Sequence, residues 1–157
     1  MTIRVGIIGT GLIGEDHGRK LVNVINGSTV SAVTDVNRAR AEQVASDLGG
    51  TKVFDTGLDL ITSDDVDAIL VTSIGPTHAE YVLACIAAGK PVMCEKPLAP
   101  TVPECEQILA AEAAFGKRLA MPAALGVLGE RIDTLGDISG RGLRMFAVFQ
   151  NLRAQRA

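Results

Sequence analysis

The sequence predicts an α/β fold of the doubly wound, Rossmann type, in which helices cover both faces of a parallel sheet. Two observations support this prediction. Short apolar runs alternate with segments of helical spacing along residues 1–119, and such alternation leads to parallel strands joined by crossover helices. The first apolar run, Val5 to Ile8, leads directly into the loop Gly9-Thr10-Gly11-Leu12-Ile13-Gly14. A strand, a glycine-rich turn and a helix N-terminus are expected in that order.

The predicted strands are short, apolar and rich in β-branched residues. The run at 66–72, Val-Asp-Ala-Ile-Leu-Val-Thr, is typical of a central parallel strand that is buried on both faces. The run at 29–34 ends at Asp35. In chain order, we predict strands at residues 5–8, 29–34, 52–54, 66–72 and 91–94.

The predicted helices alternate with these strands and begin at residues that cap helices well. Asn37 is a suitable N-cap for the second helix. The segments Thr77-His-Ala-Glu80 and Thr101-Val-Pro-Glu104 both have the form of a capping box. In chain order, we predict helices at residues 12–25, 37–48, 57–62, 77–88 and 101–115.

The pattern changes near residue 120. We therefore predict a dinucleotide-binding domain at residues 1–119 and an unmatched tail at residues 120–157. The tail holds three acidic residues and five basic ones, all arginine, whereas residues 1–119 hold 15 acidic and 10 basic residues. Pro122 interrupts the next expected strand, and no periodic assignment of the tail is convincing.

Composition argues against several classes of protein. Hydrophobic residues make up 47% and charged residues 21% of the chain, as in ordinary soluble proteins. No apolar run approaches the roughly 18 residues of a membrane helix, and the first strand leaves no room for a signal peptide, so we expect a cytoplasmic protein. The net charge of −3 and the absence of Trp argue against nucleic-acid binding. The three cysteines have no metal-type spacing, so no metal site is expected.

The glycine loop has the spacing that holds a dinucleotide pyrophosphate. Gly9 allows the tight turn, Gly11 lets the backbone approach phosphate, and Gly14 lets the helix pack close to the strand. The N–H groups and the positive dipole end of that helix then face the anion. An ordinary glycine-rich turn is the alternative interpretation.

Asp35 favours NAD as the dinucleotide. It lies 21 residues after Gly14 at the end of the second predicted strand, where a carboxylate accepts hydrogen bonds from the adenosine ribose. The same charge would repel the 2′-phosphate of NADP. Arg38 and Arg40 lie nearby and keep NADP open as the less favoured cofactor. A simple strand-end turn residue is the other interpretation of Asp35.

Two further segments follow predicted strands at the edge where open α/β sheets bind ligands. Lys96, in Glu95-Lys96-Pro97, is suited to holding a substrate hydroxyl or helping its proton leave, or else it is a solvated loop lysine. His78 is suited to contacting cofactor or substrate, or else it forms a local hydrogen bond. We interpret His17, one turn into the first helix, as structural or solvated.

Three segments together resemble the Gfo/Idh/MocA oxidoreductases: the glycine loop with Asp35, Val71-Thr-Ser-Ile-Gly-Pro-Thr-His78, and Ala88-Gly-Lys-Pro-Val-Met-Cys-Glu-Lys-Pro-Leu98. The resemblance covers about residues 2–119, is most specific at Glu-Lys-Pro, and is greatest to the inositol 2-dehydrogenases of that family. It implies hydride transfer between a nicotinamide and a ring carbon of a polyol or sugar, with Lys96 as the catalytic lysine. It also implies these cofactor-binding residues: Gly9, Thr10, Gly11, Leu12, Ile13, Gly14, Asp35, Ser73, Pro76, His78 and Glu95.

The chain departs from this family after residue 119. Members carry a second, α+β domain that binds substrate and supplies an Asp and a His, the His as general base. This chain has no His after His78, and a protonated lysine alone is a poor base near neutral pH. We therefore expect a truncated or frame-shifted product that lacks the second domain.

Three functions stay open on this basis. The chain is part of an inositol-dehydrogenase-type enzyme, or an NAD-binding module without turnover, or an unrelated Rossmann protein whose partner subunit supplies the catalytic groups. Without a second domain, apolar surface near Leu98 and Ile108 is expected to be exposed and to cause self-association.

Overall fold

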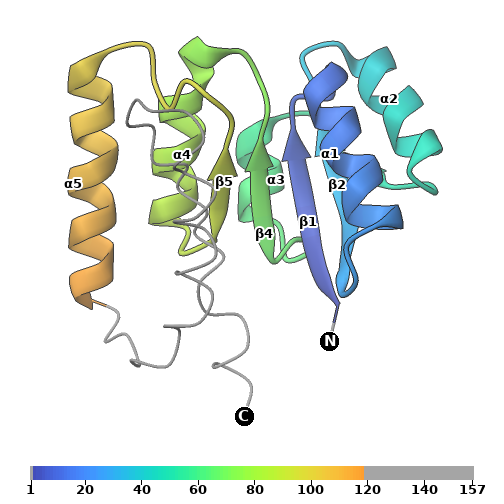
Figure 1. The fold of residues 1–157 in the computed structure, drawn as a ribbon, viewed down its shortest axis with the longest axis horizontal. Coiled ribbons are helices and arrows are strands. Elements are labelled where there is room, and N and C mark those ends of the chain that lie inside the picture. The colour runs from blue at the N-terminus through green and yellow to red at the C-terminus, as the bar shows by residue number, and fades with distance from the viewer. Residues whose placement is uncertain (1, 119–157) are drawn as a thin grey trace.

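The sheet is parallel throughout. The computed structural model describes residues 2–118, and its strands are β1 (Ile3–Ile8), β2 (Ser28–Thr34), β3 (Lys52–Val53), β4 (Ala68–Val71) and β5 (Val92–Cys94). They form one sheet in the order β3-β2-β1-β4-β5 (Figure 1). Every neighbouring pair is parallel. The predicted doubly wound fold is therefore confirmed.

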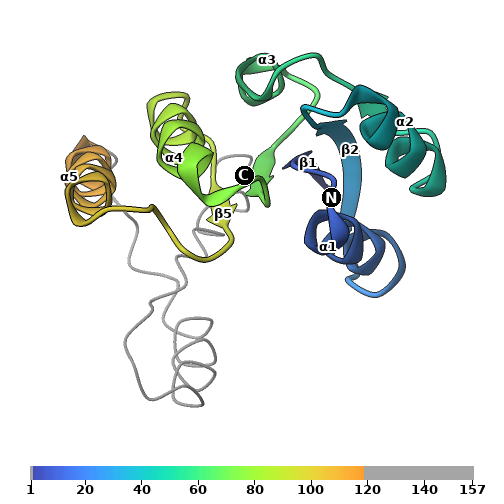
Figure 2. The ribbon, with the colours of Figure 1, turned by 90° about the horizontal axis from the view of Figure 1, so that it is seen from above.

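Helices flank the sheet on both faces. They are α1 (Leu12–Asn23), α2 (Arg38–Asp47), α3 (Gly57–Thr62), α4 (His78–Ala87) and α5 (Val102–Arg118). Figure 2 shows α1 on one side of the strands, with α3 and α4 on the other. One apolar core cluster joins the strands to α1 and α2, and a second joins them to α3, α4 and α5. Burial of apolar surface in both layers holds the helices on the sheet.

The strand order places a change of direction between β1 and β4. From β1 the chain builds outward to β2 and β3, then crosses over and builds β4 and β5 on the other side. In the register of the sheet, Ile8 pairs with Val71, and Val71 pairs with Cys94. The loops that follow β1, β4 and β5 therefore leave the sheet side by side at its carboxyl edge. In open α/β sheets this is where ligands bind.

One of the two predicted capping boxes is confirmed. Before α5, the Thr101 hydroxyl accepts from the Glu104 N–H at 3.4 Å, and the Glu104 carboxylate accepts from the Thr101 N–H at 3.1 Å. The box predicted at Thr77 is wrong, because its side chain does not cap α4. Its hydroxyl donates to the carbonyl of Ile74 at 2.8 Å, since a 3₁₀ turn at Gly75–Thr77 precedes the helix.

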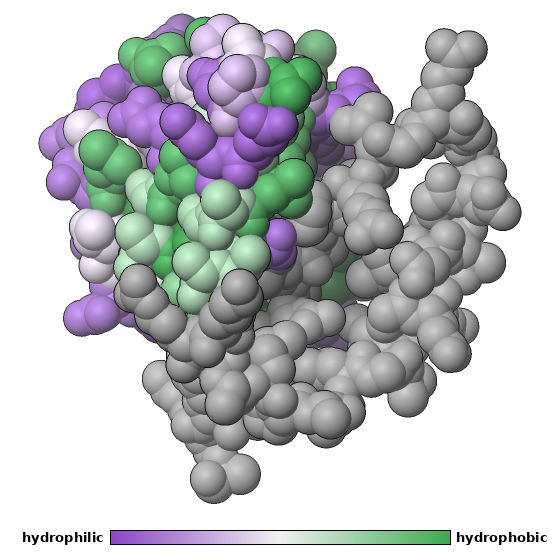
Figure 3. All heavy atoms as spheres, turned by 90° about the vertical axis from the view of Figure 1, so that its left-hand side faces the viewer, coloured by the Kyte–Doolittle hydropathy of each residue, from purple (hydrophilic) through white to green (hydrophobic). Residues whose placement is uncertain are grey.

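Ile108 itself is buried, and the exposed apolar surface expected near it lies on neighbouring residues of α5. Only 4% of the surface of Ile108 is accessible, since α5 packs against α4 in the second core cluster. Leu98 is half-buried against the same cluster. Val102 and Leu109 of α5 are exposed, and this helix lies on the side of the molecule that faces the viewer in Figure 3. Self-association through such surface stays a prediction.

The structure adds one observation on membranes. Among the helices of residues 2–118, none is both long and apolar enough to cross a bilayer. The predicted tail at residues 120–157 lies outside the described residues.

Candidate functional site

The glycine loop between β1 and α1 is anchored to the end of β4. The Gly9 N–H donates to the carbonyl of Thr34 at 2.8 Å, and the Thr72 hydroxyl donates to the carbonyl of Gly9 at 2.6 Å. Gly9 has a φ of +97°, and a Cβ there would lie 2.5 Å from the backbone nitrogen of Ser73. Only glycine satisfies both the backbone angle and this contact.

The other two glycines of the loop differ in what surrounds them. A Cβ on Gly14 would lie 2.0 Å from the carbonyl oxygen of Gly9, so this glycine is required for α1 to sit close to the strand. A Cβ on Gly11 would meet no atom within 4 Å. The fold therefore does not require glycine at position 11. Its missing side chain leaves open space beside the helix N-terminus, where a ligand can approach the backbone.

The N-terminus of α1 is suited to an anion. Gly11 is the N-cap, and no side chain caps the helix. The helix dipole and the first-turn N–H groups favour negative charge there. Three large apolar side chains are unusually exposed at the same edge of the sheet: Leu12 at 85%, Ile13 at 53% and Ile74 at 72%. Exposed apolar side chains beside an anion-binding helix end are suited to a ligand with both charged and flat apolar parts.

The carboxylate of Asp35 lies against the glycine loop. One oxygen accepts from the Thr10 N–H at 2.6 Å and from the Thr10 hydroxyl at 3.2 Å. The other accepts from the Asn37 N–H at 2.8 Å. Asp35 is half-buried, and these bonds fix its carboxylate at the end of β2. A carboxylate oxygen accepts more than one hydrogen bond, so Asp35 can still receive a ligand hydroxyl.

Both arginines that kept NADP open are paired with carboxylates. Arg40 donates from Nε to the carbonyl of Thr10 at 3.0 Å and forms an ion pair with Glu15. Arg38 pairs with Glu42 at 2.8 Å and also with Asp55. The pKa of Glu15 is lowered, first by its hydrogen bond from Arg19 and then by that from Arg40. A 2′-phosphate would have to compete with these carboxylates for either guanidinium.

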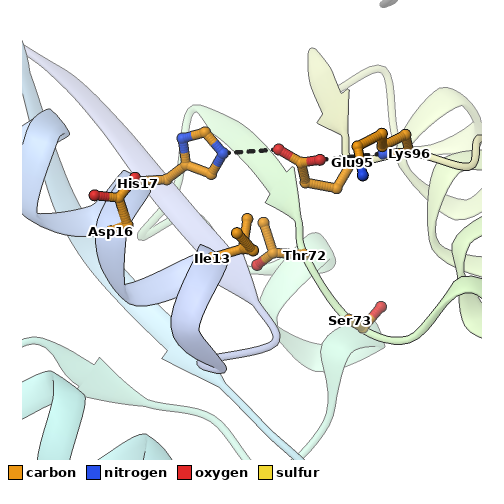
Figure 4. Close-up of a pocket in the computed structure, with 7 residues that line it drawn as sticks. All are labelled: Ile13, Asp16, His17, Thr72, Ser73, Glu95 and Lys96. Carbon is orange, nitrogen blue, oxygen red and sulfur yellow. Dashed lines mark hydrogen bonds and ion pairs between the residues drawn. The ribbon is translucent and has the colours of Figure 1, made fainter.

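A cavity of about 390 Å³ opens beside the glycine loop (Figure 4). Side chains from α1 and from the loops after β4 and β5 face it. Of the predicted site residues, the cavity brings together Ile13, Ser73, Glu95 and Lys96. The full lining is Ile13, Asp16, His17, Thr72, Ser73, Glu95 and Lys96.

His17 connects α1 to the loop that carries Lys96. Its Nε2 lies 2.8 Å from Oε1 of Glu95, and the other carboxylate oxygen accepts from the backbone N–H of Lys96 at 3.2 Å. The hydrogen bond from His17 is the largest cause of a lowered Glu95 pKa, and burial opposes it. Lys96 itself is exposed. Among the residues that the structure describes, no hydrogen bond or ion pair holds its amine.

His78 and Pro76 do not line the cavity. His78 is 1% exposed, with Nδ1 2.7 Å from the carbonyl oxygen of Pro97 and Nε2 2.9 Å from that of Ser73. A carbonyl oxygen only accepts, and a neutral imidazole ring donates from one nitrogen, so the ring donates a hydrogen bond to one of these two loops and packs against the other. Pro76 lies exposed in the 3₁₀ turn. His78 thus ties the loop after β4 to the loop after β5.

We expect Glu95→Gln to lower the free energy of unfolding near neutral pH by less than about 1 kcal/mol and to have no effect in acid. The folded chain favours the carboxylate, because His17 lowers its pKa. That stabilisation is present above the ordinary glutamate pKa of about 4.3 and is lost as the pH falls through the lowered value. Urea unfolding of both proteins from about pH 7 to about pH 3 measures the difference. A difference that does not change with pH would contradict this origin.

Three cavity residues were not predicted from the sequence: Asp16, His17 and Thr72. Thr72 lies at the end of a strand next to the predicted segment, so its place on the carboxyl edge was within reach of pattern reasoning. The interpretation of His17 as structural or solvated names no partner for it, and the structure places Glu95, 78 positions later, within hydrogen-bond distance of its ring. No local signal joins those two residues.

The fold and this edge together define a nucleotide-binding Rossmann domain. The glycine loop opens α1 at the point where the strand order reverses, with open space at Gly11 and a fixed carboxylate at the end of β2. More specifically, the model of the Gfo/Idh/MocA oxidoreductases, a family with an NAD-binding Rossmann fold, matches residues 3–122. The chain belongs to this family. The predicted resemblance is confirmed, and an unrelated Rossmann protein is excluded.

The relatives include several inositol dehydrogenases. The chain is 57% identical to inositol 2-dehydrogenase 3 of Saccharopolyspora erythraea over 119 residues. The matched region covers 76% of this chain and 35% of that protein. The chain is also 57% identical over 120 residues to the inositol 2-dehydrogenase of Serratia proteamaculans, covering 76% of this chain and 36% of the relative. The chain thus spans about a third of the length of these curated relatives.

Solved structures with the same fold carry either nicotinamide cofactor. The myo-inositol dehydrogenase of Lactobacillus casei, in complex with NAD(H) and myo-inositol, has a TM-score of 0.71 and 33% identity over 85% of this chain and 42% of its own. A 3-ketoreductase from Actinomadura kijaniata, in complex with NADP and TDP-benzene, has a TM-score of 0.66 and 29% identity over 74% of this chain and 35% of its own.

Proposed function

We propose that residues 1–119 form the NAD-binding domain of an oxidoreductase of the inositol dehydrogenase type, with Lys96 acting at a polyol or sugar hydroxyl. The observation that carries the proposal is the cavity beside the glycine loop. Lys96 lines this cavity, and no side chain of residues 2–118 pairs with its amine. The proposal assigns no function to residues 120–157. It follows the similarity to inositol 2-dehydrogenases over the matched part of the chain.

The residues present fit a dinucleotide. Open space at Gly11 and the uncapped N-terminus of α1 suit a pyrophosphate. Asp35 is fixed at the end of β2, where it can accept from ribose hydroxyls. The exposed side chains of Leu12 and Ile13 provide apolar contact area along the same ligand.

NAD fits this edge better than NADP. A 2′-phosphate beside Asp35 would meet a like charge. Arg38 and Arg40, which could otherwise attract it, already pair with Glu42, Asp55 and Glu15. The proposal therefore assigns NAD to this chain, like the NAD(H) in the similar myo-inositol dehydrogenase structure.

The chemistry follows from the position of Lys96. A bound NAD supplies the acceptor for a hydride from a ring carbon of the substrate. The Lys96 amine lies at the cavity and donates a hydrogen bond to the oxygen on that carbon, which orients the hydroxyl and stabilises the negative charge that develops as its proton leaves to a base. The described lining of the cavity provides no unpaired base for that proton. The Glu95 carboxylate, which also lines the cavity, is already hydrogen-bonded to His17.

Binding without turnover is the second candidate function. Apart from Lys96, the titratable groups that line the cavity within residues 2–118 are Asp16, His17 and Glu95. The last two bond to one another, so no unpaired histidine of this part faces the cavity to take the hydroxyl proton. This arrangement favours nucleotide binding over catalysis by residues 2–118 alone.

Calorimetry and a dehydrogenase assay on the full chain test both candidates. We expect NAD to bind at least tenfold more tightly than NADP, a difference of about 1.4 kcal/mol. NADH formation from myo-inositol would support the enzyme, and NAD binding without NADH formation would support the binding module. Lys96→Met is the matched variant, because it removes the amine: we expect it to abolish NADH formation and to weaken NAD binding by less than about tenfold. Failure of the wild-type chain to bind NAD would overturn the proposal.

A further inference from the structure

His17 links α1, the helix that follows the glycine loop, to the loop after the edge strand β5. It lies on α1, which packs beside β1 and β2, whereas Glu95 follows β5 at the edge of the sheet. Their side chains meet at 2.8 Å across the cavity, as the dashed line in Figure 4 shows. The other ion pairs of α1 stay within the helix or reach α2. Within residues 2–118, no other side-chain hydrogen bond or ion pair joins α1 to the loop after β5.

The pair is protected enough to hold a fixed geometry. The side chains of His17 and Glu95 are 26% and 27% exposed. The exposed pair Lys20–Asp16 on the same helix has 55% and 56%. Partial burial strengthens an electrostatic hydrogen bond and reduces its screening by salt. The contact is therefore more than a solvated surface ion pair.

The second oxygen of Glu95 extends this link to Lys96. It accepts from the backbone N–H of Lys96 at 3.2 Å, so the orientation of the carboxylate also sets the backbone that carries the amine. Without His17, the carboxylate would lack its partner on α1, and the adjacent ammonium of Lys96 would be its nearest opposite charge. Pairing with Glu95 would withdraw that ammonium from a ligand.

We propose that His17 is a positioning residue, which holds Glu95 and through it keeps Lys96 beside the nucleotide helix. The proposal rests on the assignment of the cavity to NAD and its substrate. It adds a residue of α1 to the site, and it makes Glu95 the residue that connects this helix to Lys96. It requires a hydrogen-bond donor at position 17 rather than an imidazole ring as such.

Three variants of the full chain test this role. His17→Leu removes the donor, His17→Gln retains a side-chain N–H, and Glu95→Gln weakens the acceptor. We measure NAD affinity by calorimetry and, without nucleotide, amide hydrogen exchange of the segment 92–100 by mass spectrometry. We expect His17→Leu to weaken NAD binding by roughly three- to tenfold and to speed exchange in that segment. His17→Gln should recover most of both effects. In the Glu95→Gln background, His17→Leu should change affinity less than twofold, because the coupled partner is already weakened.

The outcomes separate this proposal from the function on which it rests. If the wild type does not bind NAD, the proposed function fails, and the exchange data alone decide whether His17 positions the loop. If the wild type binds NAD while His17→Leu leaves affinity and exchange unchanged, the positioning role is wrong. If His17→Leu does not fold, Glu95→Gln decides, because unchanged exchange in that variant would also overturn the role. Equal losses in His17→Leu and His17→Gln would show that the ring packs rather than donates.

Discussion

Gly14→Ala is expected to lower the free energy of unfolding by about 3 kcal/mol or more, which lowers Tm by roughly 10 °C. The new Cβ would lie 2.0 Å from the carbonyl oxygen of Gly9 and 2.7 Å from the hydroxyl of Thr72. The first of these is a backbone atom of a loop that Thr72 itself anchors, so it cannot move aside as a flexible side chain would. The start of α1 must shift away from β1. Urea unfolding followed by circular dichroism, together with a thermal melt, measures the loss.

Gly11→Ala is the matched control, for which we expect little loss of stability but weaker NAD binding. No atom lies within 4 Å of its Cβ, and its φ of −62° is one that alanine adopts readily. We expect its free energy of unfolding to stay within about 0.5 kcal/mol of the wild type. NAD affinity should fall at least tenfold, because the methyl group fills the space left for a pyrophosphate. Wild-type affinity in this variant, or a loss of stability as large as for Gly14→Ala, would contradict the roles given to the two glycines.

The fold was predictable because its signals are local. Each strand is a short apolar run, and residues 66–72 could be recognised as a central strand from that run alone. The capping box at Thr101 was correct, since its threonine and glutamate need only each other. The same pattern at Thr77 was misleading, because the loop after β4 offers the hydroxyl other partners, Ser73 and Ile74. A capping pattern specifies a helix start only where nothing else competes for the hydroxyl.

The composition of the site was less predictable, because it depends on strand register. The contact between His17 and Glu95 cannot be predicted across a separation of 78 positions in the sequence. It follows from the pairing of Ile8 with Val71 and of Val71 with Cys94. The same holds for Arg40, whose sequence position suggested a 2′-phosphate ligand. Its guanidinium instead bonds to Thr10 and Glu15. These contacts depend on the tertiary arrangement that brings α2 to the glycine loop and α1, which the local sequence does not specify.

His78→Leu is expected to lower the free energy of unfolding by about 2 kcal/mol, the cost of leaving one partly buried carbonyl group without its donor. The ring is 1% exposed and lies within 2.7 Å of the oxygen of Pro97 and 2.9 Å of that of Ser73. Leucine fills much of the same volume, so lost packing contributes little to the change. Because Pro97 follows Lys96 directly, we also expect weaker NAD binding. Guanidinium unfolding and calorimetry on the full chain measure the two effects.

The second histidine of the chain provides the comparison. His17→Leu removes one partly exposed contact and is expected to cost about 1 kcal/mol or less. His78→Gln retains an N–H donor and should fall between His78→Leu and the wild type. Equal losses for His17→Leu and His78→Leu would show that the carbonyl group finds another donor, so that His78 would not be what joins the loops after β4 and β5. A large loss of stability for His78→Leu and a small one for His17→Leu would show that the two histidines have different roles. His78 would then build the edge on which Lys96 lies, and His17 would adjust the position of Lys96 on that edge.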